Sequence, residues 1–237
     1  MTLIPAPADK RLIWYLAMEE YIGRNIGLYP EGVFFTWVVE PTVIFGRHQV
    51  MENEVNIDFC RANNIAVYRR KSGGGCVYAD KGNLMLSYIV PSPHAEQVFA
   101  EYLECIAGHL VALGLDAVTT IHNDILVSSH KVSGNACYAL KHGTIIHGTM
   151  LYNVDFTQLE KAITPPAEKL EKHGVQSVRQ RVANLRPLLE KQVGNRIHSI
   201  AELTVFLESR ICQSQTTLSD SDLEAIDIIE KTYLYGL

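Results

Sequence analysis

The first apolar residues of the chain recur at helical spacing. Leu12, Ile13 and Leu16 fall on one side of a helix when they are placed at 3.6 residues per turn. Asp9 carries a side chain that commonly caps a helix start, and Gly23 allows the chain to leave a helix. The pattern therefore predicts a first helix that begins just after Asp9 and ends at Gly23.

Several later segments are apolar runs of the length that strands usually have. They are rich in β-branched and aromatic residues, and turn-forming residues separate them, as Glu40 and Pro41 separate the first two. Each run therefore predicts a strand. The runs are VFFTWVV (33–39), TVIF (42–45), IAVYR (65–69), LMLSYIV (84–90), DILV (124–127) and TIIHGTMLYNV (144–154).

Helices are expected between and after these strands. The pattern places two of them near residues 56–63 and 94–113, and two more near 199–211 and 219–233. Because helices and strands are mixed without strict β-α-β alternation, the predicted fold class is α+β. In the last helix, Ser219 and Asp222 have the spacing of a capping box.

The domain organisation follows from the absence of internal boundaries. No repeat, low-complexity tract or flexible linker divides the sequence before about residue 190. A length of 237 residues is near the upper end for one domain. We therefore expect a single domain, 1–237, with a core of about 8–190 and a helical tail of about 195–237.

The composition is that of an ordinary globular protein and argues against some function classes. Hydrophobic residues make up 47% and charged residues 20% of the sequence, and the net charge is −5. A nucleic-acid-binding protein needs a basic face to displace counterions, so nucleic acid is not an expected partner. The sequence also contains no export signal and no apolar run of about 18 residues, so no membrane partner is expected.

The cysteines carry no signature of a metal site or a disulfide scaffold. Five are present, an odd number, and they are scattered without a C-x-x-C pair. Reduced thiols are typical of a cytoplasm, so we expect a cytoplasmic location. The cysteines are Cys60, Cys76, Cys105, Cys137 and Cys212.

A run of glycines beside basic residues is the first candidate for chemistry. In YRRKSGGGCVYADKGNL (68–84), the glycines at 73–75 can bring backbone N–H groups close to an anion. Arg69, Arg70 and Lys71 can add charge-assisted hydrogen bonds. A flexible turn beside a solvated basic edge explains the segment equally well. Neither a P-loop nor a G-x-G-x-x-G motif is present, so neither familiar nucleotide fold is predicted.

A second segment, IHNDILVSSHKVSGNACYALKHGTIIHGTMLY (121–152), is dense in polar residues and glycines around two strand-like runs. Together the two segments resemble the lipoate-protein ligase family. The signatures of that family are an R-R-x-S-G-G-G-x-V-Y/F-x-D-x-G-N loop, an N-D strand, a K-x-S-G-x-A turn and an H-G-T strand. All four occur here in that order, at similar separations.

The resemblance extends beyond these motifs. PTVIFGRHQ (41–49) is similar to an early strand of the family, and GVQSVRQRVANL (174–185) is similar to its S-V-x-x-R-V-x-N-L segment. The similarity thus spans roughly residues 12–185. It implies a biotin/lipoate protein ligase-like catalytic domain with mixed, mainly antiparallel sheets flanked by helices.

The resemblance also implies an activity. Members of the family use ATP to convert lipoate into lipoyl-AMP, releasing pyrophosphate, and then pass the lipoyl group to a lysine. The acceptors are apo lipoyl domains of 2-oxoacid dehydrogenases or the glycine-cleavage H protein. The expected cofactors are therefore ATP and Mg²⁺, with lipoate as substrate. Both steps develop charge, which positioned cations and backbone donors stabilise.

Carried over by position, the resemblance assigns a catalytic role to Lys131, whose ammonium group should reach both the α-phosphate and the acyl carbonyl. Asp124 is a candidate Mg²⁺ ligand, although a turn at a strand end also explains it. Trp37 is a candidate wall of a lipoyl pocket, although apolar strand residues usually pack in the core. The residues expected to bind ATP or lipoyl adenylate are Arg70, Ser72, Gly73, Gly74, Gly75, Cys76, Val77, Tyr78, Asn83, Asn123, Asp124, Lys131, His147, Gly148 and Thr149.

The chain departs from the family pattern at two places. Ile121 and His122 stand where the family often has Gly-Arg before Asn-Asp, and loss of that arginine would weaken phosphate contacts. The sequence stops at EKTYLYGL, where many bacterial members continue into a small accessory domain. Two alternatives follow: a separate accessory-domain polypeptide is a partner needed for full activity, or the chain binds and transfers the acyl group without efficient activation.

Two other functions remain compatible with the sequence. In the first, Cys76 or Cys137 carries octanoyl or lipoyl as a thioester in a transferase that needs no ATP, which requires a lowered thiol pKa. An inert apolar role for both cysteines is the simpler reading. In the second, the chain is a non-catalytic protein that binds lipoate or an acyl-adenylate. Biotin ligation ranks lower because the G-R-G-R-x-x-R loop is absent.

Overall fold

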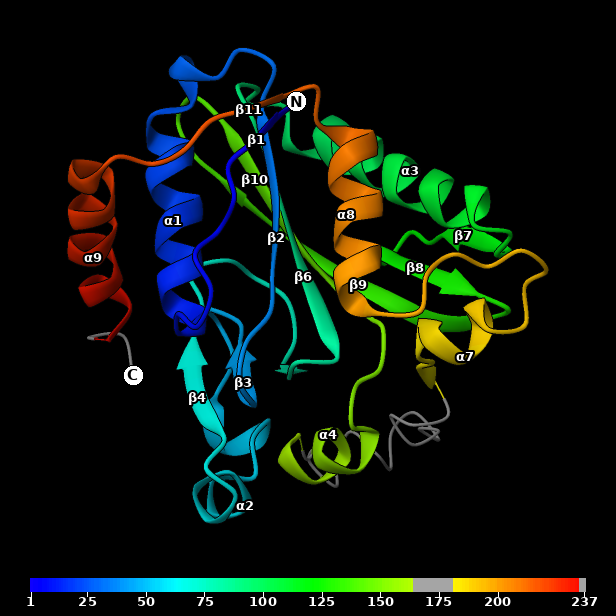
Figure 1. Cartoon of the computed structure of the whole chain (residues 1–237). Coiled ribbons are helices and arrows are strands. Elements are labelled where there is room, and N and C mark those ends of the chain that lie inside the picture. The colour runs from blue at the N-terminus through cyan, green and yellow to red at the C-terminus, as the bar shows by residue number, and fades with distance from the viewer. Residues whose placement is uncertain (164–180, 235–237) are drawn as a thin grey trace.

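Two β-sheets form the frame of the protein (Figure 1). The structure is a computed structural model that describes residues 1–163 and 181–234. One sheet has eight strands, in the order β11 (Ser214–Gln215), β1 (Thr2–Leu3), β2 (Val33–Trp37), β6 (Asn83–Val90), β10 (Thr144–Leu151), β9 (His130–Ala139), β8 (Asp124–Val127) and β7 (Ala117–Thr119). The other sheet has three strands, in the order β4 (Ala66–Arg69), β3 (Thr42–Phe45) and β5 (Val77–Ala79).

Most strand pairs are antiparallel. In the large sheet, each strand from β2 to β7 in the sheet order is antiparallel to its neighbour; the pairs are β2–β6, β6–β10, β10–β9, β9–β8 and β8–β7. Strand β1 is parallel to both β2 and β11. In the small sheet, β3 is parallel to β4 and antiparallel to β5. The predicted α+β class, with mixed and mainly antiparallel sheets flanked by helices, is confirmed.

Helices cover both faces of the large sheet. They include α1 (Leu12–Arg24) and α9 (Asp220–Leu234) on one side, and α3 (Ala95–Ala112) and α8 (Ile200–Ile211) on the other (Figure 1). No helix in residues 1–163 and 181–234 combines the length and apolar character needed to cross a membrane. The shorter helices are α2 (Ile57–Ala62), α4 (Phe156–Ala162) and α7 (Leu185–Leu189), with single turns of 3-10 helix at Ile26–Leu28 and Met51–Asn53.

Coverage on both faces explains why the β2 sequence is apolar except at Thr36. Successive side chains of a strand point to opposite faces of its sheet. Phe35 and Trp37 pack in the cluster formed with α1, whereas Phe34 packs in the cluster formed with α3 and α8. Strand β6 divides in the same way, with Met85 on the first side and Leu86 on the second. A two-sided core therefore favours apolar residues on both faces of these strands.

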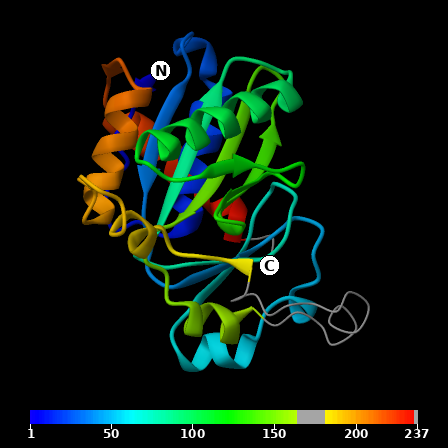
Figure 2. The ribbon, with the colours of Figure 1, turned by 90° about the vertical axis from the view of Figure 1, so that its right-hand side faces the viewer.

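The small sheet has a core of its own. Val43 and Phe45 of β3 pack with Cys60 of α2 and Leu159 of α4. Figure 2 shows this sheet with α2 and α4 at one end of the molecule, next to the large sheet. The loop between β4 and β5, residues 70–76, contains the three consecutive glycines, and we call it the glycine loop. It lies where the two sheets meet, because its Ser72 is hydrogen-bonded to His147 of β10.

Three local predictions were wrong. Asp9 does not cap α1: the N-cap position is Arg11, which makes no side-chain cap, and Asp9 has a left-handed φ of 59°. The helix also continues through Gly23 to Arg24, because its surroundings bury nearly every side of it and packing outweighs local propensity. The residues around Gly134, expected to form a turn, lie within β9.

Helix α9 offers a matched test of the packing between α1 and α9. Ile226 has 0% exposure in the α1 cluster, whereas Ile228 on the same helix is 65% exposed. Ile226→Ala should lower the free energy of unfolding by about 2–5 kcal/mol, because it removes buried methyl groups and leaves a cavity. Ile228→Ala should change it by less than about 0.5 kcal/mol. Denaturant unfolding measures both, and equal effects would contradict this placement of α9.

Candidate active site

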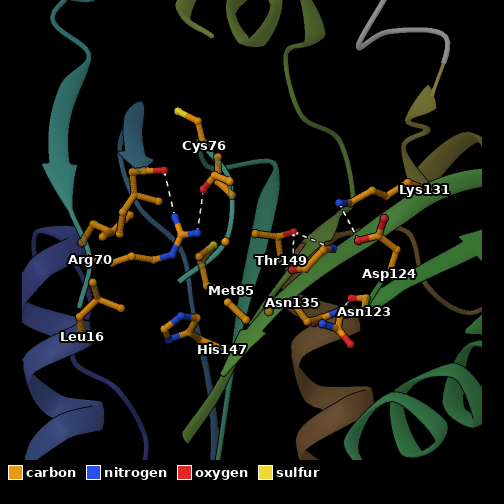
Figure 3. A pocket seen from close by; sticks show the side chains of 18 of the residues that line it. Leu16, Arg70, Cys76, Met85, Asn123, Asp124, Lys131, Asn135, His147 and Thr149 are labelled. Carbon is orange, nitrogen blue, oxygen red and sulfur yellow. Dashed lines mark hydrogen bonds and ion pairs between the residues drawn. The ribbon is translucent and has the colours of Figure 1, made fainter. Parts of the chain in front are cut away.

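A cavity of ≈ 260 Å³ lies between the glycine loop and the large sheet. We call it the main cavity. In Figure 3, Leu16 and Arg70 lie toward one end and Lys131 and Asp124 toward the other, with Thr149 between them. The apolar residues of its lining belong to one hydrophobic cluster with α1, which makes one end of the cavity apolar. They are Leu12, Leu16, Trp37, Ile44 and Met85.

A second cavity of ≈ 530 Å³ adjoins the charged end of the first. We call it the adjoining cavity. The two share lining residues, among them Cys76, Asp124, Lys131 and Thr149. Lys131 therefore stands at a junction between the main cavity, which is apolar at its far end, and a larger cavity. The rest of the adjoining cavity is lined by Glu54, Val77, Tyr78, Leu126, Ser129, Gly134, Leu151, Leu159, Ile163, Arg181 and Val182.

Arg70 holds the glycine loop in place. Its Nε and Nη2 donate to the carbonyl oxygen of Gly73 at 3.1 and 2.7 Å, and Nη2 also donates to that of Gly75 at 2.7 Å. Its Nη1 donates to the carbonyl oxygen of Ile44 on β3 at 3.3 Å. The side chain is buried, which lowers the pKa of Arg70 to about 10. The loop carbonyls therefore satisfy a cation that is protonated at neutral pH.

The other basic residues before the glycines also bind protein groups. Lys71 donates to the carboxylate of Glu20 on α1 and to the hydroxyl of Thr232 on α9, each at 2.7 Å. Arg69 donates to the carbonyl oxygens of Arg47 and Gln49 and lies over the ring of Phe45. Like Arg70, these two residues turn their charges to protein groups, so anion binding by the three basic residues stays a prediction.

Gly74 is required by the backbone itself. Its φ of +92° lies in the left-handed region, which a residue with a Cβ adopts only at a cost. A Cβ added there would also lie 2.8 Å from Nη2 of Arg70. At Gly73, by contrast, a Cβ would meet nothing within 4 Å. The loop thus depends on one glycine in particular.

Lys131 and Asp124 form an ion pair beside the junction. Nζ of Lys131 lies 2.7 Å from Oδ1 of Asp124, with the two side chains 37% and 23% exposed. The two residues face each other because β8 and β9 are adjacent antiparallel strands, with an irregular register between Ile125 and Leu126. A Cβ at Gly134 would lie 2.8 Å from Nζ, so the glycine leaves room for the lysine side chain. The ammonium is held, yet remains accessible from both cavities.

Polar side chains connect the strands around Lys131. Thr149 Oγ1 accepts from the backbone N–H of Gly134 at 3.1 Å and donates to its carbonyl at 3.2 Å. Asn135 donates from Nδ2 to the carbonyl oxygen of Asn123 at 2.9 Å and accepts at Oδ1 from the hydroxyl of Tyr102. These bonds fix the loop that carries Asn123, which has a left-handed φ of 64°. The charged end of the cavity is therefore pre-organised.

His147 is held from both sides of its ring. Its Nε2 lies 2.7 Å from Oγ of Ser72, and its Nδ1 lies 3.0 Å from Oε2 of Glu19 on α1. Oε1 of Glu19 accepts from Oγ of Ser87 at 2.6 Å, and that hydroxyl accepts from Nε1 of Trp37 at 2.8 Å. Two residues of the main cavity wall, His147 and Trp37, are thus joined beneath its surface.

The cysteines near the site are poor nucleophiles. Burial first, and the nearby Glu54 second, raise the pKa of the Cys76 thiol to about 12, although Arg70 opposes the shift. Burial also raises the pKa of Cys137. A covalent mechanism needs the thiolate form, which a raised pKa disfavours. The structure therefore gives no support to either cysteine as an acyl carrier.

Most of the residues singled out from the sequence come together. Tyr78 lines the adjoining cavity, while Ser72, Gly73 and Asn83 do not line the main one. Asn83 is fully buried and accepts at Oδ1 from the backbone of Met150, so it links β6 to β10. The main cavity is lined by Trp37, Arg70, Gly74, Gly75, Cys76, Val77, Asn123, Asp124, Lys131, His147, Gly148 and Thr149.

Sequence patterns missed some residues that line the cavity and one that supports it. The apolar spacing placed Leu12 and Leu16 on one side of the first helix without linking them to a site, and it gave Glu19 no role. A pair of consecutive acids on an otherwise apolar helix is a signal of buried partners, and it could have identified Glu19 and Glu20. Of the motif at 174–185, residues 174–180 lie outside the described part of the chain.

Comparison with known proteins assigns this arrangement to a family. A family model described as the lipoyl protein ligase A/B catalytic domain matches residues 13–202. The chain belongs to this family. Lipoate–protein ligase 1 of Staphylococcus aureus is 36% identical over 214 residues, which cover 90% of this chain and 64% of that protein. The chain thus spans less than two thirds of the length of that relative.

Solved structures of the same family share the fold. A bi-partite lipoate protein ligase of Thermoplasma acidophilum, described together with its E2 lipoyl domain, has a TM-score of 0.81 and 27% identity. That match covers 97% of this chain and 91% of the other. A second structure from this organism, with bound lipoic acid, has a TM-score of 0.77 and 25% identity, covering 98% and 94% of the two chains. The predicted lipoate ligase-like fold is confirmed.

The role of Gly74 can be tested against its neighbour. Gly74→Ala should lower the free energy of unfolding by about 1–3 kcal/mol, because alanine is strained at a left-handed φ. Gly73→Ala places a methyl group in open space and should leave stability unchanged within about 0.5 kcal/mol. Thermal or denaturant unfolding compares the two, and a larger loss for Gly73→Ala would show that the loop has a different conformation.

The state of the Cys76 thiol predicts its reactivity. With a pKa raised to about 12, the thiol is protonated at neutral pH, and its thiolate fraction grows as the pH rises. Its alkylation rate with iodoacetamide should therefore increase about tenfold per pH unit up to pH 10 without levelling off. Peptide mapping by mass spectrometry measures the rate at this cysteine. A plateau below pH 8 would mean a reactive thiolate and would restore the covalent alternative.

Proposed function

We propose that this chain is the catalytic domain of an ATP-dependent lipoate–protein ligase. The observation that carries the proposal is the position of Lys131, where the main cavity, apolar at its far end, meets the larger adjoining cavity. An acyl-adenylate has three parts that follow one another in a similar way: an apolar chain, a charged mixed anhydride and a nucleotide. Membership of the lipoyl protein ligase A/B family and the relative named lipoate–protein ligase support the assignment.

The main cavity suits an acid with one long apolar tail. Leu16, Ile44 and Met85 offer the tail an apolar surface, and burial of that surface is the main source of affinity for such a ligand. The carboxylate would lie at the opposite end, toward Lys131. Lipoate fits this description, and the family neighbour with bound lipoic acid supports it. Octanoate shares the same chemistry and is the natural competitor.

Lys131 is the proposed catalytic residue. The other strong cation of the cavity lining, Arg70, is committed to carbonyl oxygens of the glycine loop. Nζ of Lys131 is bound to a single carboxylate that is itself partly exposed, so the ammonium can turn to a phosphate. In the first step a lipoate oxygen attacks the α-phosphorus of ATP and pyrophosphate leaves. Lys131 would stabilise the charge on the phosphoryl group and the carboxylate.

The adjoining cavity is the proposed nucleotide site. Cys76 of the glycine loop and Thr149 of β10 line both cavities, so the adenylate would lie across the border between them. In the described residues no cluster of three or more His, Cys, Asp or Glu side chains forms a metal site. One carboxylate with phosphate oxygens is an ordinary ligand set for Mg²⁺, and Asp124 provides it. Mg²⁺ bound there would neutralise phosphate charge.

The second step transfers the acyl group. The amine of an acceptor lysine attacks the acyl carbonyl carbon, an amide bond forms, AMP leaves with the electrons of the broken C–O bond, and a proton passes to water. Lys131 would stabilise the carbonyl oxygen during this attack. The proposed acceptors are apo lipoyl domains of 2-oxoacid dehydrogenases or glycine-cleavage H protein. The T. acidophilum ligase, which is described together with its E2 lipoyl domain, supports the class of lipoyl-domain acceptors.

Acceptor mass is the direct test. The full chain is incubated with ATP, Mg²⁺, lipoate and an apo lipoyl domain or apo H protein, with and without an accessory-domain polypeptide. We expect the acceptor mass to increase by one lipoyl group when ATP is present. Transfer from an acyl carrier protein without ATP would favour the cysteine-dependent enzyme, and binding of lipoyl-AMP without any transfer would favour a non-catalytic role.

Lys131→Ala should lower the rate of adenylate formation, followed as pyrophosphate exchange, by about a hundredfold, because it removes the proposed electrostatic donor. Lys141→Ala removes an exposed lysine in the hairpin between β9 and β10 and serves as the control. Its rate should match that of the unaltered chain. A Lys131→Ala protein that keeps the full exchange rate would exclude this lysine as the catalytic cation.

A further inference from the structure

A chain of buried hydrogen bonds lies beneath the apolar end of the main cavity. It runs from Trp37 through Ser87 to Glu19, and from Glu19 through His147 to Ser72. Glu19, Ser72 and Ser87 are each no more than 2% exposed. An unpaired polar group at such a place would be costly, so the direction of each bond is constrained. We call this chain of five residues the Glu19 relay.

The donors and acceptors fix the direction of the relay. The indole N–H of Trp37 can only donate, so Ser87 Oγ accepts from it and gives its own proton to Glu19. The Glu19 carboxylate then accepts at both oxygens, which requires Nδ1 of His147 to carry a proton. With Nδ1 protonated, Nε2 of a neutral imidazole accepts the hydroxyl proton of Ser72.

The relay uses all the ring nitrogens of His147 and Trp37, so these two side chains offer the cavity no free hydrogen-bonding group. His147 and Trp37 both line the main cavity. Both ring nitrogens of His147, and the one nitrogen of the Trp37 indole, are already bonded to relay residues. The two side chains therefore present carbon to the cavity. An apolar ligand can lie against them without leaving a polar atom unsatisfied, and water gains little by staying there.

We propose that Glu19 is a positioning residue that fixes the Nδ1–H tautomer of His147 and thereby keeps the acyl end of the cavity apolar. This inference rests on the proposed function for the identity of the ligand, a medium-chain acid. The tautomer itself depends on the protein alone. Glu19 touches neither cavity, so its effect on the ligand passes through His147 and, by way of Ser87, through Trp37.

Glu19→Gln is the diagnostic change because it keeps the shape and alters the donors. The amide accepts at one atom and donates at the other. If its oxygen faces Ser87, its NH₂ group faces Nδ1 of His147 and forces the proton to Nε2. If its oxygen faces His147, the Ser87 hydroxyl proton has no acceptor in the relay. In the first arrangement the bond between His147 and Ser72 reverses its direction, and the Ser72 hydroxyl proton loses its acceptor in the relay. Either arrangement therefore leaves one hydroxyl proton, that of Ser72 or that of Ser87, without an acceptor in the relay, whereas a purely space-filling role would tolerate the amide.

The first experiment measures the tautomer of His147. The full chain, which has nine histidines, is labelled with ¹⁵N-histidine, and the His147 signals are identified by their loss in His147→Gln. In the unaltered chain we expect Nδ1 protonated and Nε2 unprotonated. A protonated Nε2, alone or together with Nδ1, would overturn the proposal. This measurement needs no variant of Glu19 and no ligand.

Glu20→Gln is the matched control. Glu20 is the next residue of α1 and is equally buried, but it binds Arg24, Lys71 and Tyr233 rather than His147. Loss of the Glu20 charge should lower the free energy of unfolding, but it should leave the proton on Nδ1 of His147. Glu19→Gln should move that proton to Nε2 or broaden the His147 signals. The same spectrum for both variants would mean that Glu19 has no special control of the ring.

The second experiment measures ligand affinity by calorimetry with lipoic acid and octanoic acid. Glu19→Gln should weaken the binding of both acids about tenfold, the effect of one unsatisfied buried polar group, and should leave the KM for ATP unchanged. Unchanged affinity for both acids, with a shifted tautomer, would refute the role in acyl binding. If the unaltered chain binds neither acid, the proposed function fails, while the tautomer measurement still decides the relay.

Discussion

A buried arginine with backbone partners organises the site. The guanidinium of Arg70 is bonded to carbonyl oxygens of Gly73, Gly75 and Ile44, and no carboxylate is among these partners. A buried cation must be satisfied by polar atoms, so the loop carbonyls must turn inward to meet it. That constraint fixes the conformation of the glycine loop beside the cavities. It also explains why a glycine is needed close to the basic residues, since a Cβ at Gly74 would lie 2.8 Å from Nη2 of Arg70.

Helix α1 supports this loop through two consecutive acids. Glu20 binds Lys71, and Glu19 binds His147, whose other nitrogen is bonded to Ser72. The first residues of the loop are thus tied to one helix, and α9 closes over the same place through Tyr233. The apolar wall of the cavity and the loop that borders it consequently form one rigid assembly, which is the pre-organisation that charge-stabilising catalysis requires.

Local sequence patterns were sufficient to predict much of the fold and one part of the site. The runs that form β2, β3 and β8 have strand character along their whole length, and the motifs around Gly74 and Lys131 identified the residues that meet at the cavity. The partners of the charged residues were beyond such reasoning. Glu20 is 51 positions from Lys71 and Glu19 is 128 from His147, so only the tertiary fold brings them together. Asp9 failed as a cap for a similar reason, since burial of α1 decides where the helix begins.

The most direct measurement is a crystal structure of the chain with a non-hydrolysable lipoyl-adenylate analogue. The account predicts the acyl chain against Leu16 and Met85, the nucleotide in the adjoining cavity, and the phosphate mimic within hydrogen-bonding distance of Nζ of Lys131, with the Arg70 bonds to the loop unchanged. An analogue bound away from Lys131, or one whose acyl chain lies outside the main cavity, would contradict it.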